Sequence, residues 1–582
     1  MASFALFLAA LLATAHIVYT LFGLITNICK ARSIGLPYTF TLIHELEPWA
    51  YLTDPFFRRY CRGHLLKEQG WPRWARFMIK DWHYEDKGRA HSEYGPVFLV
   101  VSPGGILCYV ADSHAALHIV SRRKAFIKPP DKMKMLELFG PNIGSADGDL
   151  WKVHSRIASP SFDEFTQKLV WTETQRQANH LRSLWSTGRN FKFEEGVYTL
   201  TLEVMGTVGF GQQDDNNEDA KPLAKDHKLL LLEALRGVIM HLPHILLIPK
   251  RLLRYSPWEA AYTAYMEMDQ YMNELLLQGK HDINSNMGHM RAREDLLKAI
   301  LRSSQENSEQ QFPPLAGKIS LTNEEIKGNL FIFLLAGYDT TANTIIYACI
   351  VLALYPDIQE SVLEEIRAFH NKVGTSDAPD KSSSEYLAMF PYTLAFMYEI
   401  LRVFPIIMPI ARQTLSQQEL TVRSEGYGTK TILLPGGIDV VVNNTAIHFS
   451  ESYWPSPHII EPRRWLVRDS STFDPSQPPT EEQAADIQRG FFSTQNIAKG
   501  TFMTFSEGPR ACLGRNFAKI EFVAFFSHLL QNHRLELGHS SSPRAIERDL
   551  RLLSGGSPVT LIPPHSVDVQ LVSQSSKNSH GR

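Results

Sequence analysis

A single cysteine near the C-terminal end of the chain stands in a setting that favours a thiolate. The ten residues F-S-E-G-P-R-A-C-L-G surround Cys512, and an apolar amphipathic helix is expected from about Arg515 to Leu530. The start of a helix offers free backbone N–H groups and the positive end of the helix dipole, which both stabilise a thiolate. Gly508 and Gly514 allow tight turns and close approach of backbone. Arg510 supplies a fixed positive charge suited to a carboxylate. The pattern favours a thiolate; for an isolated cysteine the alternative is a buried structural residue beside a turn.

The other cysteines of the chain do not predict a second cysteine-based site. The chain has 582 residues and five cysteines, without a C-x-x-C pair, which argues against a disulfide scaffold and against a cysteine-rich zinc site. A hydrophobic share of 44% is enough for a large core, and a formal net charge of −2 does not favour a nucleic-acid partner. Any special cysteine must therefore act alone.

A long apolar helix is expected in the middle of the chain. Thr322 and Glu325 form a T-x-x-E capping box, and the helix should continue to about Tyr355, before Pro356. At 1.5 Å per residue that is roughly 50 Å, enough to cross a whole domain. The helix therefore either runs through a soluble core or crosses a membrane.

Polar residues interrupt this helix at its centre. Asp339, Thr340 and Thr341 follow Gly337, although a glycine inside a helix costs about 1 kcal/mol relative to alanine. A glycine, an acid and a hydroxyl within one turn suggest a widened groove against a flat ligand, with a path for protons. A polar patch that faces solvent is the alternative, and an acid at the middle of a bilayer would be costly.

The N-terminus carries a membrane-anchor signal. The segment from Ser3 to Ile28 is almost wholly apolar, has no charged residue and is long enough to span a bilayer as a helix. Lys30 and Arg32 follow it, so the positive-inside rule places the remainder of the chain in the cytosol. A cleavable signal peptide is the competing interpretation, but no basic residue precedes the apolar run.

Helical patterns dominate elsewhere, as in Leu229–Met240 and Ser361–Phe369, so the fold class is predicted to be mainly α with small β-sheets. Short strands are expected at Val97–Val101, Cys108–Val110, Ile432–Leu434, Asp439–Val442 and Val559–Ile562. Polar stretches with prolines predict exposed loops at Gln305–Lys318 and Arg468–Arg489, and a polar tail begins at Ser573.

The ten-residue pattern at Cys512 resembles the haem-binding signature of the cytochrome P450 family. Three more motifs of that family follow its order along the chain. The central helix motif matches A-G-Y-D-T-T at 336–341. The E-x-x-R motif matches at Glu399 and Arg402. The segment P-R-R-W at 462–465 matches the family's P-x-R-W and places Arg464 with that pair in a buried network.

The resemblance covers residues 35 to 572 and implies the cytochrome P450 fold, preceded by one N-terminal transmembrane helix. It implies haem b with the Cys512 thiolate as axial ligand to iron, and such a ligand favours O–O cleavage. Thr340 would hold a water or the oxygen, Asp339 would relay protons, and Ala336 and Gly337 would leave room for oxygen.

Further cofactor contacts are implied for a larger set of residues. They are Phe505 beside the thiolate, Gly508 and Gly514 in its loop, Arg510 and Arg412 at the propionates, Trp151, and either His154 or Arg156. The last choice is open because the family often has a propionate arginine four residues after the tryptophan, where this chain has Ser155.

The implied function is a haem-thiolate monooxygenase that inserts one oxygen atom of O2 into a lipophilic small molecule, in the style of fungal secondary metabolism. Electrons would come from a separate NADPH–cytochrome P450 reductase, because no G-x-G-x-x-G follows a strand. Lys152, Arg515 and Lys519 could form a positive patch for it, or an ordinary solvated face. Two alternatives are a haem-thiolate isomerase or dehydratase that does not use O2, and a non-enzymatic membrane haem binder.

The expected location is the endoplasmic reticulum membrane, single-pass, with the catalytic part in the cytosol. A second membrane contact is expected at Leu242–Leu253, which mixes leucine and isoleucine with Lys250 and Arg251, although a buried loop would look similar. The predicted division of the chain is an anchor at 1–29, a linker and membrane-proximal segment at 30–60, the catalytic domain at 61–572 and a tail at 573–582.

Overall fold

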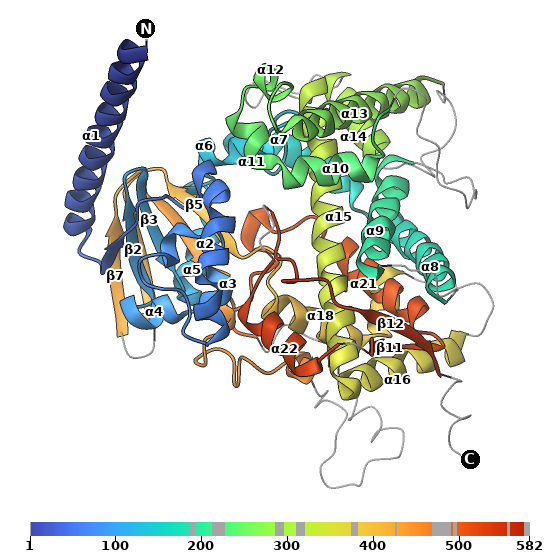
Figure 1. Cartoon of the computed structure of the whole chain (residues 1–582). Coiled ribbons are helices and arrows are strands. Elements are labelled where there is room, and N and C mark those ends of the chain that lie inside the picture. The colour runs from blue at the N-terminus through green and yellow to red at the C-terminus, as the bar shows by residue number, and fades with distance from the viewer. Residues whose placement is uncertain are drawn as a thin grey trace.

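Helices form most of the body, and a small sheet lies at one side of it (Figure 1). The computed structural model describes residues 2–186, 192–211, 227–285, 296–309, 320–373, 382–424, 428–467, 491–492, 497–539, 541–555 and 559–574. Within these ranges the expected class, mainly α with small sheets, is confirmed.

The helices vary widely in length, from single turns to the long α1 and α15. In chain order they are α1 (Ala2–Ile34), α2 (Pro48–Leu66), α3 (His83–Asp86), α4 (Arg89–Tyr94), α5 (Ser113–Ser121), α6 (Pro130–Met133), α7 (Gly148–Ala158), α8 (Glu164–Ser186), α9 (Phe193–Phe210), α10 (Leu231–Met240), α11 (Leu242–Leu247), α12 (Lys250–Leu253), α13 (Glu259–Ser285), α14 (Leu296–Glu309), α15 (Asn323–Leu354), α16 (Pro356–Val373), α17 (Ser383–Ala388), α18 (Pro391–Val403), α19 (Asn444–His448), α21 (Arg515–Leu529) and α22 (Pro543–Leu552).

The largest sheet has six strands in the order β1-β2-β3-β8-β5-β4. Their bounds are β1 (Tyr38–Phe40), β2 (Val97–Ser102), β3 (Gly105–Val110), β8 (Asp439–Asn443), β5 (Pro409–Thr414) and β4 (Phe126–Ile127). The pairs β1–β2 and β3–β8 are parallel and the other pairs are antiparallel. Three two-stranded sheets pair β6 (Gln418–Ser424) with β7 (Gly428–Leu434), β9 (Leu466–Val467) with β10 (Phe491–Phe492), and β11 (His533–Leu537) with β12 (Val569–Ser573).

The six-stranded sheet is covered on both faces, which explains why β2 is apolar throughout. Leu99 and Val101 belong to one buried cluster, and Phe98 and Val100 belong to another. Successive side chains of a strand point to opposite faces, so both faces need apolar residues.

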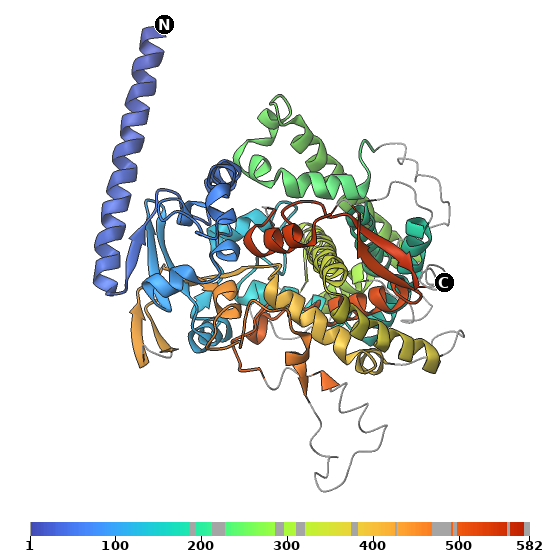
Figure 2. The ribbon, with the colours of Figure 1, turned by 60° about the horizontal axis from the view of Figure 1, so that its bottom comes forward.

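The long helix α15 crosses the centre of the body in both views (Figures 1 and 2). It begins at the expected capping box, where the Thr322 hydroxyl accepts from Glu325 N–H and the Glu325 side chain accepts from Thr322 N–H. Among the described residues, α15 is the helix whose length and hydropathy would suffice to cross a membrane, but 78% of its most apolar window is buried inside the protein. It is a core helix, and the transmembrane alternative for it is wrong.

The N-terminal helix α1 projects from the sheet side of the molecule and stands apart from the rest of it (Figures 1 and 2). Near its end, the Asn27 side-chain amide donates to the Ser102 carbonyl at 2.9 Å, which ties the helix to β2. The helix ends before Gly35, which has φ +74°, a value that favours glycine. That α1 crosses a membrane stays a prediction.

Several local expectations need correction. Residues 559–562 do not form a strand, because this segment makes isolated contacts such as Leu561 N–H to Ile406 O at 2.9 Å. Residues 305–309 continue α14 and are not a loop, and Ser573 closes β12 and does not begin a tail. The other expected strands begin and end within five residues of the observed ones. The helix expected at 229–240 corresponds to α10, and the one at 361–369 lies inside α16. The predicted loop 468–489 and residues 310–318 lie outside the described residues.

Candidate active site

A cavity of about 270 Å³ lies between the centre of α15 and the loop that carries Cys512. These two segments are far apart in the sequence, yet both contribute to the same wall. The expected site residues that line it are Ala336, Gly337, Thr340, Phe505, Arg510, Cys512, Gly514 and Trp151. The remaining lining is mostly apolar and includes Ile143, Phe162, Met205, Ile332, Phe333 and Phe517.

Cys512 lines this cavity and is exposed there. The Cys512 N–H donates to the Phe505 carbonyl at 2.8 Å, which closes the loop. Gly508 has φ +71°, and a Cβ there would lie 3.1 Å from Ser121 Cα, so the tight turn needs glycine. Burial raises the pKa of the Cys512 thiol, while a hydrogen bond from the Gly514 backbone and the charge of Arg515 lower it. Burial therefore opposes the helix start, and a metal cation bound at the sulfur would favour the thiolate.

The side chains in the polar central turn of α15 point in two directions. The Thr340 hydroxyl lines the cavity and donates to the Ala336 carbonyl at 2.6 Å, one helical turn earlier. Gly337 also lines the cavity, and a Cβ there would lie 2.5 Å from Met205 Sδ. A side chain at this position would therefore have to displace the Met205 side chain of α9, a contact that the sequence did not reveal.

Asp339 does not line this cavity. Its carboxylate accepts from the Thr560 hydroxyl at 2.6 Å through Oδ2 and from the Asn343 amide at 3.3 Å through Oδ1. Burial raises the pKa of Asp339 to about 6, although the hydrogen bonds from Thr560 and Asn343 and the charge of Arg236 lower it. The acid is therefore close to titration near neutral pH, but it is turned away from Cys512.

Positive side chains converge on one end of the cavity. Lys128 and Arg510 line it, and the buried Arg412 of β5 lies beside them. Arg510 pairs with Asp147 and donates to the Ala146 carbonyl at 2.9 Å. Burial lowers the pKa of Lys128 to about 7 and that of Arg412 to about 10, and in both cases the neighbouring arginine charges lower it further. Among the described residues, Asp147 is the carboxylate that lies against these three cations. This end of the cavity therefore has excess positive charge and would favour a negatively charged group.

The two candidates for a third contact at this end lie elsewhere. His154 is buried and contacts Asn329, whose amide nitrogen lies 2.9 Å from His154 Nδ1, and Arg156 is exposed. The residue between them, Ser155, does line the cavity. Lys128 lines this end of the cavity instead, and no motif pointed to it.

The buried carboxylate of Glu399 accepts hydrogen bonds from several segments of the chain. Arg402 donates to both of its oxygens at 2.7 and 2.9 Å, Arg464 donates to Oε1 at 3.1 Å and Trp465 Nε1 donates to Oε2 at 2.9 Å. Arg402 also donates to the carbonyls of three residues, His448, Pro457 and Ile459. Both side chains of the Glu399–Arg402 pair are fully buried, so it is not a surface ion pair.

A second group of possible metal ligands lies away from the cavity. Glu45, Asp81 and His83 place one ligand atom each within 4.8 Å of the others. The Glu45 carboxylate already accepts from the Tyr109 hydroxyl and from the Asp81 N–H, and Asp81 pairs with Lys80. Because both carboxylates have protein donors, we describe this group as a buried hydrogen-bond network.

Comparison with known proteins decides the family. The cytochrome P450 family model matches residues 77–562. This chain belongs to the cytochrome P450 family. It is 33% identical to the cytochrome P450 monooxygenase prx9 of Penicillium rubens and 34% identical to the cytochrome P450 monooxygenase ORF6 of Penicillium roqueforti, with 95% of each chain covered. It is similar in fold to a zebrafish cytochrome P450 with abiraterone, with a TM-score of 0.59 and 20% identity over 83% of this chain and 98% of that chain.

The P450 is a monooxygenase and a haem-thiolate enzyme, as the sequence predicted. Its site fits the cofactor on two observations of this structure. A cysteine sulfur faces the cavity from one side, and three cations opposed by one carboxylate stand at one end, where a group with two carboxylates would balance the charge. We therefore expect Cys512 to bind the iron, and Arg510, Arg412 and Lys128 to meet the propionates.

The Glu399 network should carry much of the stability of this P450. Glu399→Ala leaves the charge of the buried Arg402 and that of the partly buried Arg464 uncompensated, which costs about 3–5 kcal/mol of a free energy of unfolding of roughly 5–15 kcal/mol. We expect little haem-loaded protein and a lower melting temperature. Arg367→Ala is the control, because its pair with Glu360 is exposed and is worth less than about 1 kcal/mol. A well-folded, haem-replete Glu399→Ala protein would contradict the structural role.

The charge at the cavity end predicts an effect on cofactor retention. Lys128→Met keeps the length of the side chain and removes its charge, so it should speed haem dissociation about tenfold, as expected for loss of one charge-assisted hydrogen bond. The measurement is the rate of haem transfer to excess apomyoglobin. The exposed neighbour Lys124→Met should leave that rate unchanged. Equal rates in Lys128→Met and the unaltered protein would remove Lys128 from the site.

Proposed function

We propose that this P450 inserts one oxygen atom of O2 into a lipophilic small molecule, with electrons from a separate NADPH-dependent reductase. The observation that carries the proposal is the pair of Asp339 and Thr340 on α15, with the Thr340 hydroxyl in the same cavity as the Cys512 sulfur. An isomerase or dehydratase that does not use O2 has no need of an acid and a hydroxyl at this place.

The roles of the chain's own residues follow from the geometry. Haem held by the Cys512 thiolate would supply the activation of O2 for oxidation of a substrate carbon. Thr340 holds a proton at its hydroxyl beside that centre, and Asp339 exchanges protons from the next position of the helix. Phe505 packs next to the Cys512 loop, where its ring limits the access of water to the sulfur.

The cavity lining supports a lipophilic substrate. Ile143, Phe162, Ile332 and Phe333 present apolar surface, as small-molecule sites commonly do, with few polar groups to fix orientation. A relative of Leptosphaeria maculans, 25% identical over 88% of each chain, is named as a phomenoic acid biosynthesis cluster cytochrome P450 monooxygenase. We therefore place this enzyme in secondary metabolite biosynthesis. A metabolite comparison between cells with and without the gene identifies the compound that gains an oxygen atom.

Exposed apolar residues support attachment to the endoplasmic reticulum membrane. The side chains of α1 are largely exposed at Phe7, Ile17, Tyr19 and Phe22, which would be unfavourable in water. A second exposed apolar group stands on and beside α12, at Leu252, Tyr255 and Trp258. Figure 1 shows α12 and the N-terminal end of α1 toward the same side of the molecule.

The reductase is proposed to dock near the cysteine loop. Lys152 is half exposed next to its partner Asp149, and Arg515 begins the helix that follows Cys512. Burial lowers the pKa of Lys519. A buried lysine contributes less to an exposed positive patch. Lys152 and Arg515 are therefore the better members of the predicted surface.

Loss of the Thr340 hydroxyl should separate electron consumption from product formation. Thr340→Ala should keep haem and substrate binding, because it removes only a hydroxyl and a methyl group. Misdirected protons should then release hydrogen peroxide while NADPH is still consumed, and product should fall by up to about 10²–10⁴-fold. The assay measures product, peroxide and NADPH together. Thr344→Ala, one turn further along α15, is the control, because its hydroxyl bonds the Thr340 carbonyl and does not line the cavity.

Two outcomes of that assay would count against the proposal. Unchanged coupling in Thr340→Ala would remove this residue from proton delivery. Turnover of the unaltered enzyme without NADPH would contradict the proposed monooxygenase function itself.

Removal of residues 1–22 should release the protein from membranes in part and leave haem binding intact. The cut spares Asn27 and Ile28, which pack on the sheet. Leu252→Asp together with Tyr255→Ser, combined with the truncation, should release the remainder, because charged or polar groups replace the second apolar contact. The measurement is fractionation of membranes in high salt. A truncated double variant that still pellets like the full chain would contradict both contacts.

A further inference from the structure

A small cavity of about 50 Å³ lies where the C-terminal ends of α15 and α18 meet α22. Its lining differs from that of the Cys512 cavity at every described position. Lys87, which follows α3, lines it between Tyr84 and Phe449, and its other basic side chains are His458 and Arg551. The volume is enough for a few water molecules or for one small ion.

The amino group of Lys87 lies between two aromatic rings. Its Nζ is 3.1 Å from the ring centroid of Tyr84 and 4.5 Å from that of Phe449. An ammonium is attracted to the face of such rings, but they are weak acceptors for its N–H groups. In the part of the chain that the structure describes, this buried Nζ has no hydrogen-bond acceptor. A buried donor without an acceptor commonly marks the place of a water molecule or an ion.

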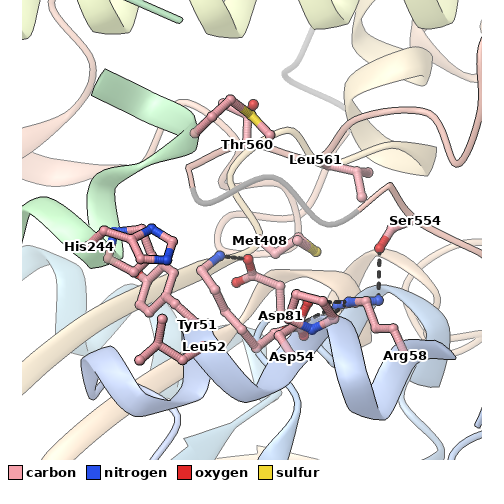
Figure 3. A pocket seen from close by; sticks show the side chains of 14 residues that line it. Tyr51, Leu52, Asp54, Arg58, Asp81, His244, Met408, Ser554, Thr560 and Leu561 are labelled. Atoms are coloured by element: carbon pink, nitrogen blue, oxygen red, sulfur yellow. Dashed lines mark hydrogen bonds and ion pairs between the residues drawn. The ribbon is translucent and has the colours of Figure 1, made fainter. Parts of the chain in front are cut away.

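The carboxylate whose charge acts on Lys87 is already bonded to other groups. This carboxylate is Glu85, which pairs with Arg58 and accepts from the Ser554 hydroxyl at 2.7 Å. Figure 3 shows Arg58 bonded to Asp54 and Ser554 on the wall of a separate pocket. The neighbouring network therefore fixes Glu85, and among the described residues Glu85 forms no ion pair with Lys87.

The other charges near Lys87 are mainly positive. Burial lowers the pKa of Lys87 well below its usual value, the charge of Glu85 raises it, and the charges of Arg551, Arg402 and Arg89 lower it further. A small anion in the cavity would supply the missing acceptor and a compensating negative charge.

Two exposed side chains at the edge of the cavity restrict what could enter. Glu547 accepts from the Tyr355 hydroxyl at 2.6 Å, and Arg551 pairs with Glu68. The Glu547 carboxylate would repel an anion with several charges, and the volume is too small for an organic acid of substrate size. A single monovalent ion of the size of chloride satisfies both limits.

We propose that this cavity binds one chloride ion, which accepts from the Lys87 ammonium on the inside and faces Arg551 at the entrance. The ion would join three segments that are far apart in the sequence, namely the turn after α3, the segment that carries His458, and α22. Pro457 precedes His458, and its carbonyl accepts from Arg402 at 2.7 Å. Chloride would therefore stabilise a segment on which the buried arginine depends.

The first test measures the melting temperature of the haem-loaded full chain in detergent. Sodium chloride replaces sodium gluconate at constant sodium concentration, so that the ionic strength stays fixed. A ligand that binds only the folded protein stabilises it by mass action, so the melting temperature should rise by about 1–2 °C and then reach a plateau as chloride approaches about 150 mM.

Two variants separate this site from a general effect of salt. Lys87→Met keeps the length of the side chain and removes its charge, so its melting temperature should not respond to chloride. Arg548→Met is the matched control, because Arg548 is an exposed residue of α22 that pairs with Asp549 and does not line the cavity. It should respond as the unaltered protein does. An equal response of the Lys87→Met and Arg548→Met proteins would overturn the proposal.

The second test locates the ion in the unaltered protein and needs no variant. Crystals of the haem-loaded enzyme in sodium bromide, with data at the bromine absorption edge, should show an anomalous peak in the cavity beside Lys87 Nζ. A cavity that holds water only, without such a peak, overturns the proposal whatever the melting temperatures show.

Discussion

The buried carboxylate of Glu399 is the interaction on which the site depends. Its two oxygens accept from Arg402, Arg464, Trp465 and the Glu461 N–H, so one charged group joins α18 to the segment 461–465. Such a charge is tolerated inside a protein only when its lone pairs are satisfied. Loss of any one donor would leave a buried charge with an unsatisfied lone pair, and this free-energy cost keeps each donor in place.

The cysteine loop is built against this network. The Phe502 ring packs on Tyr398 and Trp465, with ring centroids 5.3 and 4.9 Å apart, and Thr504 donates to the Leu401 carbonyl at 3.3 Å. Phe505 lies against Tyr398 in the same way, at 6.0 Å. The segment before Cys512 thus rests on the residues that Glu399 fixes, which places the sulfur relative to α15 although no hydrogen bond joins α18 to the cysteine itself among the described residues.

Sequence reasoning could find the parts of this site that depend on local patterns. The capping box placed the start of α15 at the correct residue, and the glycines around Cys512 predicted a tight loop before a helix. It could not find Lys128 or Thr560, because each belongs to the site only through contacts with segments far away in the chain. Nor could it place His154 and Arg156, whose directions depend on how α7 is rotated. Burial, which no local pattern measures, raises the pKa of the Cys512 thiol and so opposes the effect of the helix start.

Thr340 and Asp339 are neighbours on α15 but face different surroundings, for a physical reason. Thr340 faces the apolar cavity, where its hydroxyl is satisfied by the Ala336 carbonyl of its own helix. Asp339 cannot be satisfied in that way, because a carboxylate needs donors and the helix interior offers none. It therefore turns to the side where Thr560 and Asn343 supply them. An acid in an apolar cavity beside a lipophilic substrate would incur a desolvation cost without compensation. Its position on the other face of the helix keeps the cavity side apolar and leaves a carboxyl with a raised pKa one residue away from Thr340.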